Sequence, residues 1–165
     1  MENVNLNANP SAVLVMLKGE DGENPQLVEM VKDWITKMGC SIIFEAPAKY
    51  DIEACQIHYC KMLERDIYPS LEEYITSGTS YGMIVLGSRE NLRELKKSVG
   101  KPVNPAPDTL RGILFKVTGR TDDKNFVHCS DVDELDIDGE NSLAMKEIAN
   151  FKNVAKLTAE NNLNV

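Results

Sequence analysis

The sequence predicts one α+β domain, a four-stranded antiparallel sheet in a split βαβ, ferredoxin-like arrangement with helices packed on it. Short apolar runs that suit buried strands alternate with segments whose apolar residues recur at helical spacing. No glycine-rich phosphate loop lies between these segments, which favours an α+β sandwich. At 165 residues the chain is long enough to bury a real core.

Composition limits the classes of function. A hydrophobic fraction of 42% with 27% charged residues is ordinary for a soluble globular protein. No apolar run approaches the roughly 20 residues that span a bilayer, so we expect no membrane association. The net charge of -8 argues against a broad surface for nucleic acid, although it leaves room for a local basic pocket.

The ends of the chain and its cysteines bear on location. The asparagine-rich start lacks the charged and apolar regions of a secretory signal. We therefore expect a flexible arm over 1–10, a domain over 11–151 and a C-terminal tail over 152–165. The four cysteines form no C-x-x-C pair and no familiar zinc pattern, so free thiols in a reducing cytosol are the plainest interpretation.

Three strands and three helices are expected in the first half. Each strand is an apolar run, and each helix is an apolar stripe between capping or breaking residues. Pro25 suits a first helical turn, Asp51 is a good N-cap, and Pro47 follows the second strand as a breaker. In order, these are the strand 12–17, the helix 25–38, the strand 40–44, the helix 51–64, the short helix from Tyr68 to the turn at Ser77, and the strand 83–86.

The second half begins with a polar helix that Ser88 caps. A loop over 100–108 follows, in which three prolines in nine residues prevent regular structure. In order, the remaining predictions are the helix 89–99, an extended segment over 113–117, a polar loop over 118–124, a short strand over 126–128 and a last helix over 142–151.

An acidic stretch over 131–140 resembles the start of a calcium loop at Glu134. Such a loop needs a bidentate acid at its twelfth position, which here is Met145. A solvated acidic loop is the preferred interpretation. A metal-binding or scaffold protein built on this stretch is the non-enzymatic alternative.

His128, one of two histidines, stands near the end of the predicted fourth strand. A histidine there can point into a cleft as nucleophile, base or ligand, or it can be an ordinary strand-end residue. Lys18 likewise either closes the first strand or carries a cation to a site. His58 is adjacent to Tyr59 in a helix, so the two point to different sides, and we expect His58 to serve packing or capping.

Five motifs, in order and at nearly the family's spacing, resemble the nucleoside diphosphate kinases over about 12–151. They are Lys18-Gly19-Glu20-Asp21-Gly22; the pair His58-Tyr59 with Arg65; Pro107-Asp108-Thr109-Leu110-Arg111-Gly112; Asn125-Phe126-Val127-His128-Cys129-Ser130-Asp131; and Lys146-Glu147-Ile148. Each motif is weak alone, and together they are specific.

The resemblance implies the nucleoside diphosphate kinase fold and activity. In that activity the γ-phosphate of ATP or another nucleoside triphosphate passes to a nucleoside diphosphate through a phosphohistidine, in a ping-pong cycle. His128 would be the nucleophile, because neutral imidazole both accepts and returns a phosphoryl group near pH 7. Glu147 would orient its ring, steadied by Ser130. The alternative is a divergent, weakly active or inactive nucleotide-binding or regulatory module.

The resemblance also implies the nucleotide contacts. Fixed cations would neutralise the transferring phosphoryl, and the nucleotide rather than protein side chains would carry Mg²⁺. Tyr59 would hold Lys18 and wall the site, and Asn125 with Lys18 would meet the ribose hydroxyl. The expected nucleotide-binding set is Lys18, Arg65, Ile67, Leu71, Lys96, Arg111 and Asn125.

This sequence departs from the family by insertions before Asn125 and after Asp131, and by four changes that bear on the site and the assembly. Ile67 replaces a base-stacking phenylalanine, and Lys96 replaces a phosphate-binding arginine, which removes the bidentate fork. Cys129 replaces a glycine beside the catalytic histidine, so we expect a thiol that crowds the ring or brings oxidation to the site. The loop over 100–107 is shorter than the family's. Because that loop packs between trimers in the family, we expect a homo-oligomer that is either a dimer or a hexamer.

Overall fold

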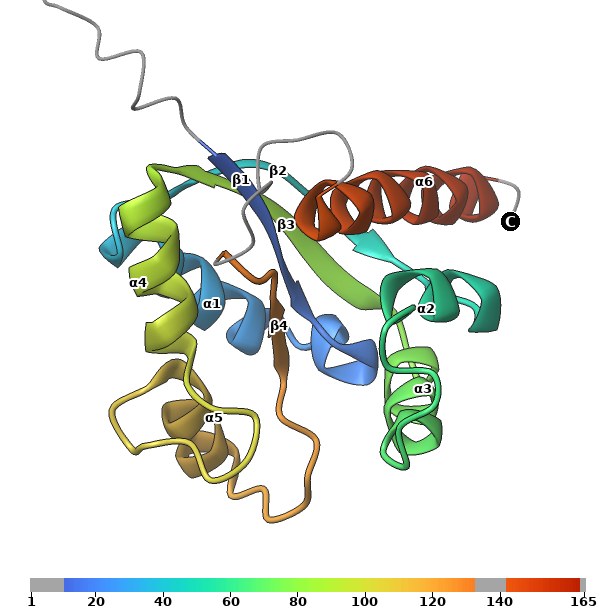
Figure 1. Ribbon diagram of the computed structural model, residues 1–165. Coiled ribbons are helices and arrows are strands. Elements are labelled where there is room, and N and C mark those ends of the chain that lie inside the picture. The colour runs from blue at the N-terminus through green and yellow to red at the C-terminus, as the bar shows by residue number, and fades with distance from the viewer. Residues whose placement is uncertain (1–10, 133–141, 164–165) are drawn as a thin grey trace, which may run out of the picture.

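A computed structural model describes residues 11–132 and 142–163 of the chain. Within these residues four strands form one sheet in the order β2-β3-β1-β4, and every neighbouring pair is antiparallel. The strands are β1 (Ser11–Leu17), β2 (Ser41–Ala48), β3 (Ser80–Gly87) and β4 (Val127–Cys129). This confirms the predicted α+β class and the four-stranded antiparallel sheet (Figure 1).

Helices cover both faces of the sheet (Figure 1). They are the 3-10 helix η2 (Gly19–Glu23) and the α-helices α1 (Pro25–Lys37), α2 (Ile52–His58), α3 (Tyr68–Thr76), α4 (Arg89–Val99), α5 (Leu110–Thr118) and α6 (Leu143–Leu163). The expected caps are confirmed, since the side chain of Asp51 accepts from the Ala54 amide and that of Ser88 from the Asn91 amide. No helix in the described residues combines the length and apolarity needed to cross a bilayer.

The central strand β1 divides the core in two. Val13, Val15 and Leu17 face the layer of α1, α4 and α5, whereas Leu14 and Met16 face the layer of α2, α3 and α6. All five are fully buried, because helices cover both faces of this strand. The period of two along a strand therefore decides which layer each side chain of β1 and β4 joins.

Four element predictions are wrong, three of them before the last helix. The segment 113–117 belongs to helix α5 because the Thr109 side chain caps it at the Gly112 amide and Gly119 ends it in a left-handed conformation. The helix predicted over 51–64 ends at His58, after which the chain runs in turns to α3. Strand β2 continues past Pro47 because it is an edge strand, where a missing N–H leaves no ladder bond unmade.

The last helix does not end at Phe151, as the sequence predicted, but runs to Leu163. Val154 and Ala155 continue its buried face, and the Thr158 hydroxyl accepts a 2.8 Å hydrogen bond from the Lys49 amide. This polar segment carries enough apolar residues at helical spacing to hold it against the sheet. Residues 1–10 and 133–141, with the expected arm and the calcium-like stretch, lie outside the described residues.

Candidate active site

Strand pairing brings the predicted site residues together. His128 lies opposite Met16 in the β1–β4 ladder, so its ring faces the layer of α2, α3 and α6. Lys18 follows β1 directly, and its backbone N–H donates to the carbonyl of Phe126 at 2.9 Å. The Lys18 ammonium donates to the Asn125 side-chain oxygen at 2.5 Å. The end of β1 and the start of β4 thus share one corner of the sheet.

A carboxylate on α6 holds the His128 ring. The Nε2 of His128 lies 2.7 Å from Oε1 of Glu147, which is 4% exposed. The Ser130 hydroxyl donates to the same oxygen at 2.7 Å and accepts from the Leu14 amide at 2.9 Å. A carboxylate accepts from an N–H, so this contact favours the tautomer with the proton on Nε2 and a lone pair on Nδ1.

The ring of His128 is held uncharged. Burial lowers its pKa well below the usual value, and the positive charges of Lys96, Lys18 and Arg111 lower it further. Burial raises the pKa of the Glu147 carboxyl, while the hydrogen bond from Ser130 acts in the opposite direction. The site therefore presents a neutral imidazole among cations.

Three cations surround this imidazole. Burial, with the nearby charges of Arg111 and Lys96, lowers the pKa of Lys18 to about 7. The Lys96 ammonium donates to the Cys129 carbonyl at 2.5 Å and pairs with Asp131 at 3.2 Å. Such a concentration of positive charge in a poorly solvated corner is the environment that an anionic group requires.

Arg111 is more tightly engaged than expected for a phosphate ligand. Its guanidinium donates to the carbonyls of Gly100 at 2.6 Å, Asn125 at 3.2 Å and Val127. The side chain is 7% exposed. Arg111 therefore fastens the proline loop to β4 while its charge still acts on Lys18 and His128.

Three of the remaining predicted residues lie farther out, whereas Tyr59 lies beside His128. Arg65 and Ile67 are exposed in the turn before α3, and Leu71 is partly buried against the α2–α3 layer. Tyr59 is buried, with its ring centroid 6.2 Å from that of His128. Of the expected set, the structure brings together Lys18, Tyr59, Lys96, Arg111, Asn125, His128, Ser130 and Glu147.

His58 is buried and packs, as expected, but its ring packs against His128, and it lies beside the Tyr59 ring although we expected these neighbours to point to different sides. Its ring centroid lies 4.4 Å from that of His128 and 4.4 Å from that of Tyr59. Burial lowers its pKa to about 3, and neither ring nitrogen has a hydrogen-bond partner. Its place at the end of α2, next to Tyr59, was the only local signal of this position.

Cys129 does not crowd the ring of His128. The strand alternation turns its side chain into the opposite core layer, where it is 1% exposed. Burial raises the pKa of its thiol to about 12, so a reactive thiolate does not form there. The expectation of a thiol beside the ring is therefore wrong.

An ion pair that the sequence did not suggest fixes this corner of the sheet. Both oxygens of the buried Asp21 carboxylate accept from Arg120, at 2.7 and 2.8 Å. The Tyr74 hydroxyl donates to Asp21 and accepts from the Phe126 amide at 3.1 Å. Phe126 has a φ of 67°, a conformation that is strained for a bulky side chain. The network holds Phe126 where its carbonyl can meet the Lys18 amide.

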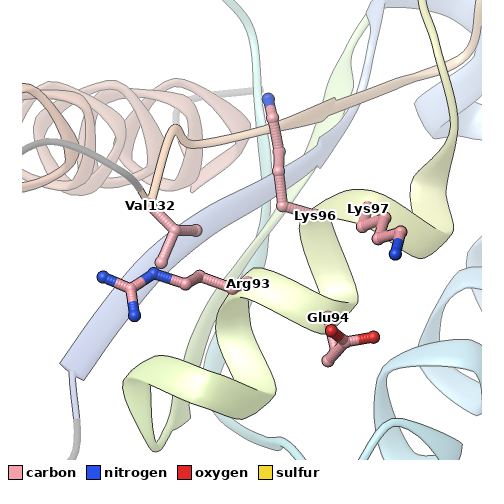
Figure 2. A pocket seen from close by; sticks show the side chains of 5 residues that line it. All are labelled: Arg93, Glu94, Lys96, Lys97 and Val132. Carbon is pink, nitrogen blue, oxygen red and sulfur yellow. The ribbon is translucent and has the colours of Figure 1, made fainter.

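A surface pocket opens beside these cations. It is lined by Arg93, Glu94, Lys96, Lys97 and Val132. Figure 2 shows Lys96 reaching from α4 toward β4, whereas Lys97 points away. All of the positive charge in this lining comes from α4, so the pocket continues the basic character of the site outward.

Known proteins resemble this chain over most of its length. The family model described as nucleoside diphosphate kinase matches residues 12–148. A nucleoside diphosphate kinase of Methanosarcina acetivorans is 37% identical over 129 residues, 73% of this chain and 78% of that protein. One from Methanosarcina mazei is 35% identical over 122 residues, with the same coverage.

Solved structures show the same fold. Nucleoside diphosphate kinase from Encephalitozoon cuniculi superposes with a TM-score of 0.69 at 20% identity, over 86% of this chain and 88% of that one. The halophilic enzyme from Halobacterium salinarum, solved in complex with CDP, gives a TM-score of 0.66 at 22% identity, over 85% and 86%.

The Asp21–Arg120 pair should contribute strongly to stability. We expect Asp21→Asn to lower the free energy of unfolding by about 3–5 kcal/mol, because it leaves a largely buried guanidinium without its counter-charge. Urea denaturation followed by circular dichroism measures this. Glu29→Gln is the control, since the exposed Glu29–Lys32 pair contributes less than about 1 kcal/mol. Equal effects of the two substitutions would contradict the assignment.

Proposed function

The chain belongs to the nucleoside diphosphate kinase family, and we propose from this that His128 carries the phosphoryl group between nucleotides. The chain is thus a phosphotransferase that moves the γ-phosphate of a nucleoside triphosphate to a nucleoside diphosphate. The observation that supports the role of His128 is its 2.7 Å contact with Glu147, which leaves Nδ1 as the free ring nitrogen.

The proposed reaction has two displacements at phosphorus. The Nδ1 lone pair of His128 attacks the γ-phosphorus, the bond to the β,γ-bridging oxygen breaks, and the nucleoside diphosphate leaves with that electron pair. A terminal oxygen of a second diphosphate then attacks the phosphohistidine, and the N–P bond breaks. Nε2 keeps its proton throughout, and Glu147 stabilises the charge that the phosphorylated ring gains.

Cations prepare the site for this transfer. Lys18, Arg111 and Lys96 all act on His128, so negative charge that spreads over the transferring group meets fixed positive charge. In oxyanion holes of other enzymes, one such preorganised donor is worth roughly 10²–10³ in turnover. Tyr59 and Asn125 complete the inner wall, where Asn125 fixes the Lys18 ammonium.

The nucleotide itself is proposed to extend toward α3. The ring of His128 faces the layer of α2, α3 and α6, and Arg65, Ile67 and Leu71 border that layer. Ile67 is 58% exposed, which leaves an aliphatic surface free for a base. Arg65 lies in the same exposed turn and is proposed to meet the phosphates of the nucleotide.

Mg²⁺ is proposed to arrive with the nucleotide. The carboxylates of this region are already engaged: Glu147 by His128 and Ser130, Asp131 by Lys96, and Asp21 by Arg120. Because these three carboxylates are already paired, Mg²⁺, which favours oxygen ligands, is proposed to be held by the phosphates of the nucleotide. When bound to the nucleotide, Mg²⁺ neutralises charge on its phosphates.

One observation favours the alternative of a nucleotide-binding module with little turnover. Arg111 directs its guanidinium at three backbone carbonyls rather than into open space. If those contacts persist when nucleotide binds, one phosphate cation acts only at a distance. Phosphoryl transfer in vitro separates the two candidates.

The oligomeric state is inferred from the exposed surface of β2, and the cellular location from the free cysteines. The edge strand β2 exposes Ile43 at 57% and Phe44 at 45%, and an exposed apolar edge favours pairing with another chain. We therefore infer a homo-oligomer, a dimer or a hexamer, that uses this edge. The four cysteines are all free, which supports a cytoplasmic location.

Phosphorylation of His128 tests the function directly. Incubation with γ-labelled ATP and Mg²⁺ should give an acid-labile label on the protein that a GDP chase removes as labelled GTP. His128→Asn should take up no label while its circular dichroism and melting temperature stay close to those of the parent. Label that persists in this variant, or that resists acid, would rule out His128 as the carrier.

The charge of Lys18 should shape the pH profile. Because the protonated ammonium binds phosphate, kcat/KM should fall as pH rises past about 7, the pKa of Lys18. No loss is expected near pH 6.5 on the acid side, since the pKa of His128 lies well below that value. Lys18→Arg keeps its charge and should move the alkaline limb beyond the measured range. An unchanged limb in this variant would contradict the assignment.

The β2 edge should determine the oligomeric state. Light scattering after size exclusion should give the parent a mass of at least two chains of 18.4 kDa. Phe44→Lys should shift the mass toward one chain, because a charge then faces the partner. Ile57→Lys, at an equally exposed apolar residue on α2, should leave the mass unchanged. A monomeric parent chain would refute the inference.

A further inference from the structure

Among the buried polar atoms of the described residues that have no hydrogen-bond partner are both ring nitrogens of His58. His58 is 4% exposed, and neither of its ring nitrogens makes a hydrogen bond to the described residues. Buried polar atoms nearly always have a hydrogen-bond partner, because leaving one without a hydrogen bond costs about 1–3 kcal/mol. A neutral imidazole always has one nitrogen lone pair, so His58 offers an unused acceptor or metal ligand at the centre of the site.

The neighbours of this lone pair are also metal-ligating groups. One nitrogen of His58, one of His128 and one carboxylate oxygen of Glu147 all lie within 4.8 Å of one another. They come from the end of α2, from β4 and from α6, so three separate elements converge on them. We propose that His58, His128 and Glu147 form a binding site for Zn²⁺ or a similar divalent transition metal ion, which excludes phosphorylation of His128.

The donor set selects the class of metal. Two imidazoles and one carboxylate are a common set of protein ligands for zinc, with a fourth position left to water. Mg²⁺ and Ca²⁺ require oxygen ligands, so the two nitrogens disfavour both. This site is therefore distinct from the Mg²⁺ that a nucleotide brings.

The geometry requires a small closure. With zinc–ligand bonds of about 2.0–2.1 Å, tetrahedral ligand atoms lie about 3.4 Å apart. The widest separation of up to 4.8 Å has to shrink by roughly 1.4 Å, while the 2.7 Å contact between His128 and Glu147 opens to admit the ion. Rotation of the His58 or His128 side chain about its χ angles would move a ring nitrogen by a distance of this size.

The surrounding cations oppose the metal. Lys18, Lys96 and Arg111 repel a divalent cation from His128, whereas Glu147 and Asp131 attract it. Binding should therefore be reversible and weaker than at a structural zinc site. A metal bound to Nε2 of His128 leaves the proton of the neutral ring on Nδ1, so the nitrogen that attacks phosphorus loses its lone pair and zinc-bound protein should not accept a phosphoryl group.

Zinc titration of the full chain tests the site without reference to activity. Calorimetry with ZnCl₂ should show one ion bound per chain, and Co²⁺ should give the absorption of a tetrahedral nitrogen–oxygen site. His58→Asn should weaken binding by about tenfold or more, as loss of a zinc ligand requires. Cys60→Ser is the control, because it removes the exposed thiol as a competing ligand and should change nothing. His58→Gln is a second variant should His58→Asn fail to fold.

A second readout connects the site with phosphorylation and rests on the proposed role of His128. In metal-buffered solution, Zn²⁺ should suppress labelling by ATP, a chelator should restore it, and His58→Asn should need at least tenfold more zinc. Loss of zinc binding in His58→Asn without any labelling of His128 would uphold the metal site and refute the proposed function. Absence of zinc binding by the parent chain, or equal affinity in His58→Asn, would overturn the metal site.

Discussion

The contact between His128 and Glu147 organises the functional part of this structure. It joins β4, the shortest strand, to α6, the last helix, across the face of the sheet. Helix α6 can lie this close because Gly82 of β3 has no side chain, and a Cβ there would meet the Phe151 ring at 2.3 Å. The position of the carboxylate thus depends on the packing of Phe151 against β3, and Ser130 ties the same oxygen to β1.

A second constraint is the low polarity in which the cations stand. Lys18 is 5% exposed, and the same burial that strengthens its attraction for phosphate weakens its hold on its own proton. The corner tolerates this because Asn125 binds the ammonium and the Asp21–Arg120 pair holds the strained Phe126 in place. One network therefore supplies both stability and preorganisation, because the buried Asp21–Arg120 ion pair holds the backbone that positions Lys18.

The sequence predicts the sheet and the central residues of the site because short stretches of neighbouring residues carry the signal for both. Continuous apolar runs marked the strands, and short motifs marked Lys18, His128 and Glu147. It missed α5, where β-branched residues outweighed the Thr109 cap, and the end of α6, where buried residues are sparse among polar ones. It also missed pairs that only folding brings together: Arg120 is 99 residues from Asp21, and His58 meets His128 through helix placement alone.

The isomer of phosphohistidine is the most direct test of the central claim that Glu147 binds one ring nitrogen and leaves the other to react. Nuclear magnetic resonance of the phosphorylated protein, labelled with ¹⁵N in its histidines, identifies which nitrogen of His128 is bonded to phosphorus. We expect the phosphoryl group on Nδ1, with the Nε2 proton still bonded to Glu147. A phosphoryl group on Nε2 would contradict the claim, because that nitrogen would have to abandon the carboxylate that is supposed to orient it.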